Sequence, residues 1–422
     1  MKKTIVCFGP GPMFKGGIAN YNTSLAKAFD KQEDTEVHIV SWTQQYPAII
    51  PRDFIDRKSK ENQLKGTNIK VHYITNYNHP GSWAATVRLI EKLKPQKVIF
   101  QWAIAIQGIP LGFIARKLKK NKAIEVIFDL HFVIQKEGSA LDKRFTKMGI
   151  RQSDAYVVHA YKTARELKAL FPEKKFEVLE RGQKYSGSGI RVMKLYHPVY
   201  DMFQPDPDFD VQKAKNEMGL KKHVFLFFGF IRKYKGLHNV IRAFAQLAEE
   251  RDDVSLLIVG ESFWNTLDNN KLSTRIKNAT FGVAKKIFLK KQDDERNYHP
   301  LALIDELNLR EKTYVMNDFV PNEMVHKYFQ VSDYIMLFYL TATPSGIESI
   351  AYNFRMPMLA TRVGHFSETI QDGYNGYLAE PENIDSMTGV MRKAIEHPIP
   401  RENVAETAKD MSWENYAAEI LR

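Results

Sequence analysis

A short basic loop between two apolar stretches is the part of the sequence best suited to bind an anion. The apolar run 223–229 is followed by Arg232, Lys233 and Lys235, and an amphipathic segment begins at Gly236. This order is typical of a buried strand, a turn and a helix. In an open α/β sheet, ligands bind at the carboxyl edge of the strands, where a helix N-terminus favours anions. Arg232 and Lys235 are therefore predicted to hold a phosphate-bearing ligand; the alternative is a solvated basic turn.

Two other loops lead into expected helices and could present backbone N–H groups to an anion. Gly16 and Gly17 directly precede a helical pattern over 18–29, and glycines there allow close backbone approach. Ser345 and Gly346 follow the apolar run 334–338 and are placed to start another helix. For the first loop, a purely structural turn is an equally good interpretation.

The elements that must position these residues alternate between short apolar runs and amphipathic stretches. This alternation predicts α/β domains with parallel sheets covered by helices on both faces. The expected strands are 3–8, 36–41, 68–74, 97–102, 123–129 and 155–159, and then 223–229, 254–260, 312–320, 333–339 and 357–363.

The domain organisation follows from length and from a break in the pattern. A chain of 422 residues is too long for one ordinary core, so two domains of roughly 200 residues each are expected. Pro198, Pro205 and Pro207 lie close together where the alternation stops, which suits a connection between domains. We predict domains over 1–200 and 201–397, with an insertion at about 262–311.

Composition limits the partners. Hydrophobic content of 44% and charged content of 26% are typical of a globular protein, and the net charge of +12 indicates an acidic partner. No zinc-ligand spacing, RNA-binding aromatic signature or helix-turn-helix is found, so nucleic acid is not expected. Glycine and proline interrupt the longest apolar stretch, 98–115, and no membrane span is predicted. A single cysteine, Cys7, and the absence of a signal-peptide pattern predict a cytoplasmic location.

Charge clusters suggest two further kinds of site. The basic segments 116–122 (Arg116–Lys122) and 285–291 (Lys285–Lys291) are predicted to contact an anionic membrane surface, although a lysine-rich solvated face explains them equally well. Asp206, Asp208 and Asp210 have spacing like a calcium loop, but Val211 stands where the sharp turn needs glycine. A solvated acidic turn is the better interpretation, and no metal site is predicted.

Several of these segments together resemble one enzyme family. "GGIANY", the "HP" linker, "FFGFIRKYKG", "TPSGIESIAYNFRMPMLATRVGHFSETIQDGYNGYL" and "SWENYAAEIL" are similar, in this order, to retaining glycosyltransferases of family 4. The resemblance covers nearly the whole chain and is strongest over 223–380. It implies the GT-B fold, in which two Rossmann-like domains face each other across a cleft, with the helices of 398–422 packing back on the N-terminal domain.

The resemblance also implies a reaction and its partners. A nucleotide-diphosphate sugar binds mainly to the C-terminal domain, and a glycan or lipid-linked acceptor binds to the N-terminal domain. The product belongs to cell-surface polysaccharide or glycolipid synthesis at the inner face of the membrane. The family needs no cofactor and no divalent metal for this transfer.

The residues that match the family motif receive roles by resemblance. Arg232 and Lys235 neutralise the departing diphosphate, a preorganised stabilisation of transition-state charge. His131, at the end of an expected strand, contacts the sugar or the acceptor and is counted among the catalytic residues. The donor-binding positions are Gly16, Gly17, Gly229, Ser345, Gly346, Ile347 and Glu348.

One departure from the family pattern is expected to change how the donor is held. The family commonly has two glutamates eight positions apart, and the corresponding residues here are Ala342 and Ile350. Glu348 is two residues from the second position, about 200° around a helix, and does not simply substitute. A catalytically silent, nucleotide-binding or scaffold relative on the same fold is the alternative function. A sugar-nucleotide epimerase or a phosphorylase of the same fold is a third class that the C-terminal pattern fits less well.

Overall fold

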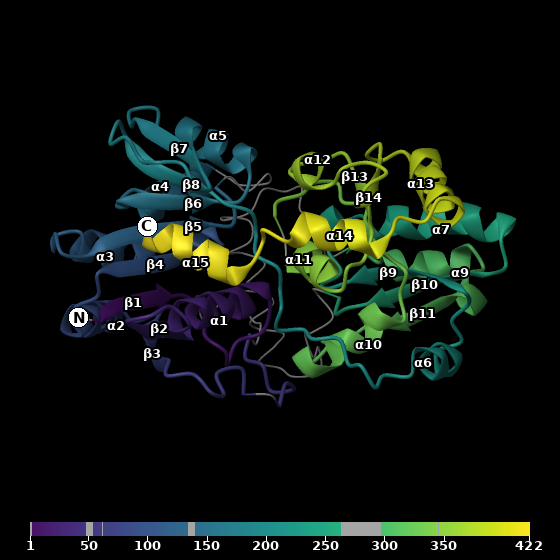
Figure 1. Cartoon of the computed structure of the whole chain (residues 1–422), viewed down its shortest axis with the longest axis horizontal. Coiled ribbons are helices and arrows are strands. Elements are labelled where there is room, and N and C mark those ends of the chain that lie inside the picture. Colours follow the sequence, from purple (N-terminus) through teal and green to yellow (C-terminus); the bar gives the residue numbers. More distant parts are fainter. Residues whose placement is uncertain (1, 48–53, 61, 134–139, 263–296, 345) are drawn as a thin grey trace.

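The computed structural model describes the chain except residues 1, 48–53, 61, 134–139, 263–296 and 345 (Figure 1). The described residues form two domains, each built on a parallel β-sheet with helices packed on it. The carboxyl ends of both sets of strands face the boundary between the domains, which is where the two sheets can contribute residues to one site.

The N-terminal domain contains an eight-stranded sheet in the order β3-β2-β1-β4-β5-β6-β8-β7, and every neighbouring pair is parallel. Its strands are β1 (Lys3–Phe8), β2 (Thr35–Gln44), β3 (Lys70–Asn76), β4 (Lys97–Trp102), β5 (Glu125–Leu130), β6 (Ala155–Val158), β7 (Phe176–Glu180) and β8 (Ile190–Lys194). Its helices are α1 (Gly17–Asp30), α2 (Pro80–Leu93), α3 (Gly108–Leu118), α4 (Ala140–Ile150) and α5 (Tyr161–Leu170).

The C-terminal domain contains a six-stranded sheet in the order β11-β10-β9-β12-β13-β14, again parallel throughout. Its strands are β9 (His223–Phe228), β10 (Val254–Val259), β11 (Thr313–Met316), β12 (Tyr334–Leu337), β13 (Met358–Thr361) and β14 (Gly376–Ala379). Its helices are α6 (Val211–Glu217), α7 (Leu237–Glu250), α9 (Leu303–Glu306), α10 (Val325–Gln330), α11 (Gly346–Asn353), α12 (Phe366–Thr369) and α13 (Ile384–Glu396).

The central strands are apolar on both faces because helices cover both faces of each sheet. In β9, every residue from Val224 to Phe228 is buried, and the same holds for all of β10. Helix α7 buries its apolar stripe on this sheet, and the buried residues include Leu237, Val240, Ile241, Phe244 and Leu247. The parallel α/β class predicted from the alternation is therefore confirmed.

The strand positions agree with prediction in the sheet centres and less well at the edges. β1 and β4 have the predicted bounds, whereas β7, β8 and β14 were not predicted. β7 is an edge strand whose residues are mostly half-buried, so it lacks the continuous apolar run that identifies a central strand. The predicted insertion at 262–311 falls largely outside the described residues, and α9 lies in its described part.

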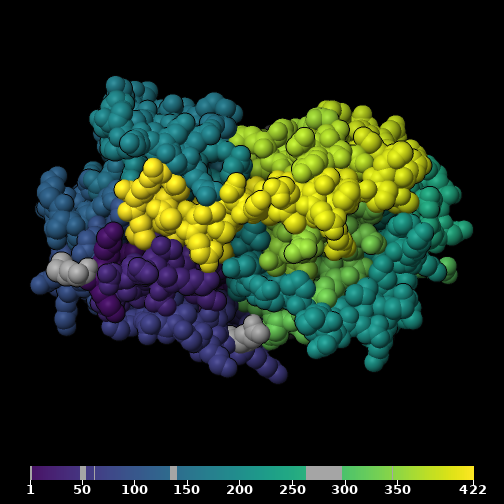
Figure 2. Space-filling view, in the orientation of Figure 1, coloured from purple at the N-terminus to yellow at the C-terminus, as the bar shows by residue number. Residues whose placement is uncertain are grey.

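Two segments cross between the domains side by side. The linker after β8 runs from the first domain to the second, and the chain returns through α14 (Arg401–Ala408) and α15 (Trp413–Leu421). Helix α14 packs against α11, whereas α15 packs against α1, so the return to the N-terminal domain is made by α15 (Figures 1 and 2). The Val199 N–H donates to the Met411 carbonyl oxygen at 2.9 Å, which joins the two crossings.

Candidate active site

The loops that follow β9 and β12 meet at the centre of the second sheet. Strand order reverses there, since β10 and β11 lie on one side of β9 and β12 to β14 on the other, and such a switch point is where open α/β sheets bind ligands. The Leu340 N–H donates to the Tyr234 carbonyl oxygen at 2.7 Å. Gly236 has φ +67°, and a Cβ there would collide with the Phe338 carbonyl oxygen. Glycine is therefore required for the basic loop to pack against the end of β12.

This packing buries Lys235 at the carboxyl edge of β9. Its side chain is only 6% exposed, and its Nζ lies 6.0 Å from the centre of the Tyr339 ring. None of the carboxylates in the described part of the chain forms an ion pair with it. Burial, and then the positive charge of Arg232, lower the pKa of Lys235 to about 7. A buried ammonium group without a carboxylate partner is well suited to an incoming anion.

The second predicted loop-to-helix junction lies directly beside Lys235. A Cβ added to Gly229 would be 2.9 Å from the Lys235 Nζ and 3.0 Å from the Ile347 Cδ1. Gly229 has φ +92°, which also favours glycine. The structure therefore brings Gly229, Lys235 and Ile347 together at the carboxyl edge of β9.

A tyrosine of the linker, Tyr200, contacts both the N-terminal glycine loop and the start of α11. The Tyr200 hydroxyl donates to the Gly17 carbonyl oxygen at 2.9 Å, and a Cβ on Gly346 would lie 2.6 Å from the Tyr200 ring. Gly16 precedes α1 with φ +98°. Tyr200 was not singled out from the sequence; its only signal is its place in the linker "HPVY".

His131 lies at the carboxyl end of β5 and is held by two neighbours. Its Nε2 is 2.8 Å from the Gln101 Oε1, and its ring is 4.6 Å from the Tyr21 ring. Burial lowers the pKa of His131 to about 4, although the charge of Asp129 opposes the shift. The imidazole is thus neutral at pH 7; it donates to Gln101 through Nε2 and keeps a lone pair on Nδ1, which can accept a hydrogen bond from a hydroxyl group.

A second histidine, His197 of the linker, connects His131 to the C-terminal domain. Its ring lies 6.2 Å from the His131 ring and 4.9 Å from the Tyr21 ring. Its Nδ1 is 2.6 Å from the Ser349 hydroxyl of α11, three residues after Gly346. The structure therefore places His131 next to residues that pack on the predicted donor junction, although 131 and 349 are far apart in sequence.

The other predicted residues are placed as follows. Arg232 is half-buried, with its guanidinium carbon 5.9 Å from the centre of the Tyr234 ring. Ser345 lies outside the described residues. Ala342 and Ile350 are buried and apolar, so neither position offers a side-chain hydrogen bond to a ligand.

Glu348 is already engaged within the protein. It is 4% exposed; one carboxylate oxygen pairs with the His365 Nε2, and the other accepts from the Thr369 hydroxyl at 2.5 Å. These contacts tie α11 to the turn that follows β13. Donor binding by Glu348 remains a prediction, and its described contacts give it a structural role.

The acidic linker residues act in local turns. The Asp210 carboxylate accepts from the Lys213 N–H and caps α6, and the Asp206 carboxylate accepts from the Asp208 N–H. Within the described ranges, no group of three or more His, Cys, Asp or Glu residues is arranged to hold a metal ion. Across the same ranges, no helix is long and apolar enough to cross a membrane.

Of the two basic segments predicted to contact a membrane, the structure describes only the first. Lys285–Lys291 lies outside the described residues. In Arg116–Lys122, Arg116 is exposed, Lys117 lies over the Phe113 ring at 5.7 Å, and Lys119 pairs with Asp154. Contact with a membrane surface stays a prediction.

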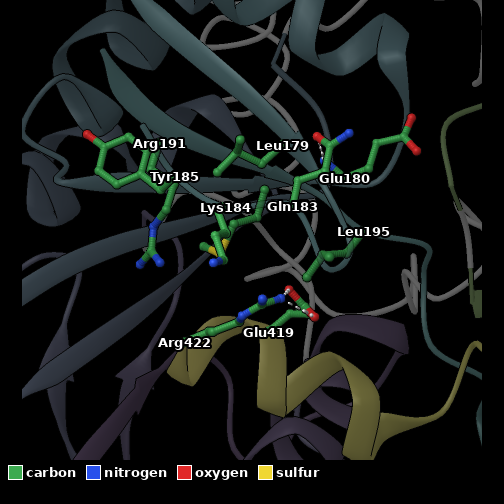
Figure 3. A pocket seen from close by; sticks show the side chains of 10 residues that line it. Leu179, Glu180, Gln183, Lys184, Tyr185, Arg191, Leu195, Glu419 and Arg422 are labelled. Carbon is green, nitrogen blue, oxygen red and sulfur yellow. Dashed lines mark hydrogen bonds and ion pairs between the residues drawn. The ribbon is translucent and has the colours of Figure 1, made fainter. Parts of the chain in front are cut away.

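The cavity in Figure 3 is separate from the predicted site. It has a volume of about 340 Å³ and lies between the β7–β8 edge and the end of α15. Two of its cations have carboxylate partners, since Arg191 pairs with Glu125 and Arg422 with Glu419. It contains none of the predicted catalytic or donor-binding residues.

The C-terminal half of the chain matches a known sequence family, whereas the whole chain matches solved structures in fold. Residues 208–411 match the family Glycosyl transferases group 1. The match covers the β9 loop with Lys235 and the junction at the start of α11. The group 1 glycosyltransferase resemblance is thereby supported for the C-terminal domain.

Curated relatives are similar over about half of their own length. The lipopolysaccharide 1,2-N-acetylglucosaminetransferase of Salmonella typhimurium is 24% identical over 207 residues, which is 46% of each chain. The N-acetyl-alpha-D-glucosaminyl L-malate synthase of Bacillus anthracis is 27% identical over 223 residues, 50% of this chain and 47% of the relative.

Solved structures match the whole chain in fold. Anabaena HepE in complex with UDP and glucose superposes with a TM-score of 0.68 over 99% of both chains, at 13% identity. At this identity the likeness shows the fold alone. Together with the two parallel sheets, it confirms the predicted GT-B architecture.

Proposed function

We propose that this protein is a glycosyltransferase that moves a sugar from a nucleotide-diphosphate donor to a glycan or lipid-linked acceptor. The observation that carries the proposal is Lys235, a buried ammonium at the switch point of the second sheet, beside Gly229 and the start of α11. The family match over 208–411 supports the donor class, and the UDP-bound structure of HepE shows that a protein of this fold binds such a nucleotide.

The chemistry assigned to the site is stabilisation of the leaving group. When the bond between sugar and diphosphate breaks, negative charge grows on the phosphate oxygens. In this proposal the phosphate oxygens lie beside Lys235 and Arg232, and the charge of a buried lysine acts more strongly than it would in solution. The N–H groups at the start of α11 would add donors of the same kind. Stabilisation that increases in the transition state raises kcat.

The acceptor side belongs to the N-terminal domain in this proposal. His131 is neutral and can accept a hydrogen bond from a sugar or acceptor hydroxyl. A lipid-linked acceptor in polysaccharide or glycolipid synthesis would bring the protein to an anionic membrane surface, for which the exposed basic end of α3 is the described candidate.

Retention and metal independence are proposed from the family resemblance and can be tested together. A panel of nucleotide sugars is incubated with the protein, and the anomeric proton of the transferred or hydrolysed sugar is followed by NMR. We expect release of product with the donor's anomeric configuration at a rate that EDTA does not change. An inverted product or a loss of activity in EDTA would contradict these two parts. Binding without turnover would favour the silent relative, which the apolar side chains of Ala342 and Ile350 suggest.

The affinity for a nucleoside diphosphate is expected to fall as the pH rises above 7. Lys235 binds an anion in its protonated form, and its pKa of about 7 lies below that of an ordinary lysine. Above this pH the free protein must first take up a proton, so the Kd is expected to increase by up to about tenfold per pH unit. The same depressed pKa has a consequence for stability. Between pH 7 and the higher pKa that Lys235 has in the unfolded chain, the unfolded chain binds more protons than the folded one. The free energy of unfolding is therefore expected to increase with pH over this range.

Calorimetric titration with UDP between pH 7 and 9 measures this dependence. The matched control is Lys235→Arg, because a guanidinium stays protonated over the whole range and its Kd should be nearly independent of pH. Equal pH profiles for the two proteins would show that the ammonium of Lys235 does not bind the diphosphate.

A further inference from the structure

A fully buried carboxylate lies behind His131 and is held by three donors from distant parts of the chain. Asp129, near the end of β5, is 0% exposed. Its Oδ2 accepts from the Tyr21 hydroxyl at 2.9 Å and from the Tyr416 hydroxyl at 3.1 Å, and its Oδ1 is 2.9 Å from the His159 Nε2. These donors lie on α1, on α15 and directly after β6.

The carboxylate is ionised in this setting. Burial alone would raise the pKa of Asp129, but the His159 ring and the hydroxyl donors more than compensate, and the pKa lies below its usual value. No lysine or arginine in the described part of the chain pairs with it. Removing any one donor therefore weakens the solvation of a buried charge, which the remaining groups can restore only by moving.

Tyr21 transmits this arrangement to His131. The Tyr21 ring is fully buried, with its hydroxyl fixed by Asp129 and its ring in edge contact with the rings of His131 at 4.6 Å and His197 at 4.9 Å. Among the described residues, the His131 side chain has one hydrogen-bond partner, Gln101, and its ring also stacks on the His159 ring at 5.5 Å. Its orientation therefore depends on where Tyr21 and His159 are held.

The helix at the end of the described chain is part of this arrangement. Tyr416 lies on α15, which packs against α1, and its ring stacks on the His159 ring at 5.9 Å. The linker histidine extends the same cluster to Ser349 of α11. The cluster thus joins the proposed acceptor side and the proposed donor side through residues from both crossing segments.

We propose that Asp129, His159 and Tyr416 are positioning residues, which hold Tyr21 and through it His131 in the orientation used for transfer. The role in transfer rests on the proposed function. The coupling between α15 and His131 does not, because it is a property of the folded chain. Through this coupling, α15 helps to position a residue of the proposed acceptor site in addition to joining the two domains.

The first test compares Tyr416→Phe with a matched control, Tyr334→Phe. Tyr334 is also buried and its hydroxyl donates one hydrogen bond, to the Ala394 carbonyl oxygen at 2.6 Å in the C-terminal domain. We expect Tyr416→Phe to lower kcat by about 10- to 100-fold, because small misplacements of a reacting group have effects of this size. The Kd for UDP should stay within about twofold, since Lys235 is not in the cluster. Tyr334→Phe should keep the wild-type kcat.

The second test does not depend on turnover. In protein labelled with ¹⁵N in histidine, the ring signals of His131 are recorded for the wild type, for both tyrosine variants and for Asp129→Asn. We expect the His131 signals to shift in Tyr416→Phe and Asp129→Asn and to stay in place in Tyr334→Phe. Asp129→Asn should also lower the His131 pKa further, because the charge that opposed the effect of burial is gone.

The outcomes separate the two proposals. If the protein binds UDP but transfers no sugar, the proposed function fails, and the His131 signals alone decide the coupling. If Tyr416→Phe matches Tyr334→Phe in its His131 signals, the positioning role of α15 is refuted, whatever the activity. If the signals shift but kcat does not change, His131 is coupled to α15 without serving the reaction, and the positioning role is again refuted.

Discussion

Replacing Lys235 by alanine is expected to lower kcat/KM by at least about 100-fold, the scale for losing one preorganised donor to a developing negative charge. The reason is its placement. The Nζ is enclosed at the switch point, without a carboxylate partner in the described part of the chain, and beside the backbone of Gly229. A water molecule in the vacated space would carry no charge and would have to reorient as the diphosphate leaves.

The neighbour Lys233 provides the control for this variant. It lies in the same loop with the same formal charge, but its side chain is exposed and its field is screened by solvent. Lys233→Ala should change kcat/KM by less than about threefold. Both variants are assayed with the donor identified in the nucleotide-sugar panel. Near-wild-type turnover in Lys235→Ala would remove Lys235 from the mechanism.

Replacing Glu348 by alanine is expected to lower the free energy of unfolding by about 1–3 kcal/mol, the usual cost of leaving a buried hydrogen-bond donor unsatisfied. The carboxylate bonds both the His365 ring and the half-buried Thr369 hydroxyl, so its loss leaves the buried His365 Nε2 without its described acceptor. His365 is itself 1% exposed, and water does not readily replace the missing oxygen atoms.

An exposed pair in the same domain is the control for this stability measurement. Glu380 pairs with Arg362 at 3.1 Å, but its side chain is 61% exposed, and Glu380→Ala should cost only about 0–1 kcal/mol. Urea unfolding of the wild type and the two variants gives the comparison. A cost for Glu348→Ala no larger than that for Glu380→Ala would show that the buried pair does not hold α11 to the turn after β13.

The predictable parts of the molecule are those whose signal is local in sequence. Lys235 could be predicted because strand, turn and helix follow one another within residues 223–250, and the apolar run of β9 marks a strand buried on both faces. The edge strand β7 and its neighbour β8 lack such runs, so their existence depends on neighbours that the sequence pattern does not reveal.

The cluster behind His131 could not be predicted for a different reason. Tyr21, Asp129 and Tyr416 come from α1, β5 and α15, and nothing in their spacing indicates that they meet. The burial of Glu348 is a similar case, since it depends on how α11 is rotated against the turn after β13. Propensity and periodicity place a residue on an element, whereas these contacts arise from how the elements pack.

We propose above all that a nucleoside diphosphate binds on Lys235 at the switch point of the second sheet. The most direct test of this claim is a thermal-shift panel of UDP, GDP, ADP, TDP and CMP, with and without magnesium, on the wild type and on Lys235→Ala. We predict that one diphosphate raises the melting temperature of the wild type equally with and without magnesium and has no effect on Lys235→Ala. No shift with any nucleotide, or the same shift in both proteins, would contradict the claim.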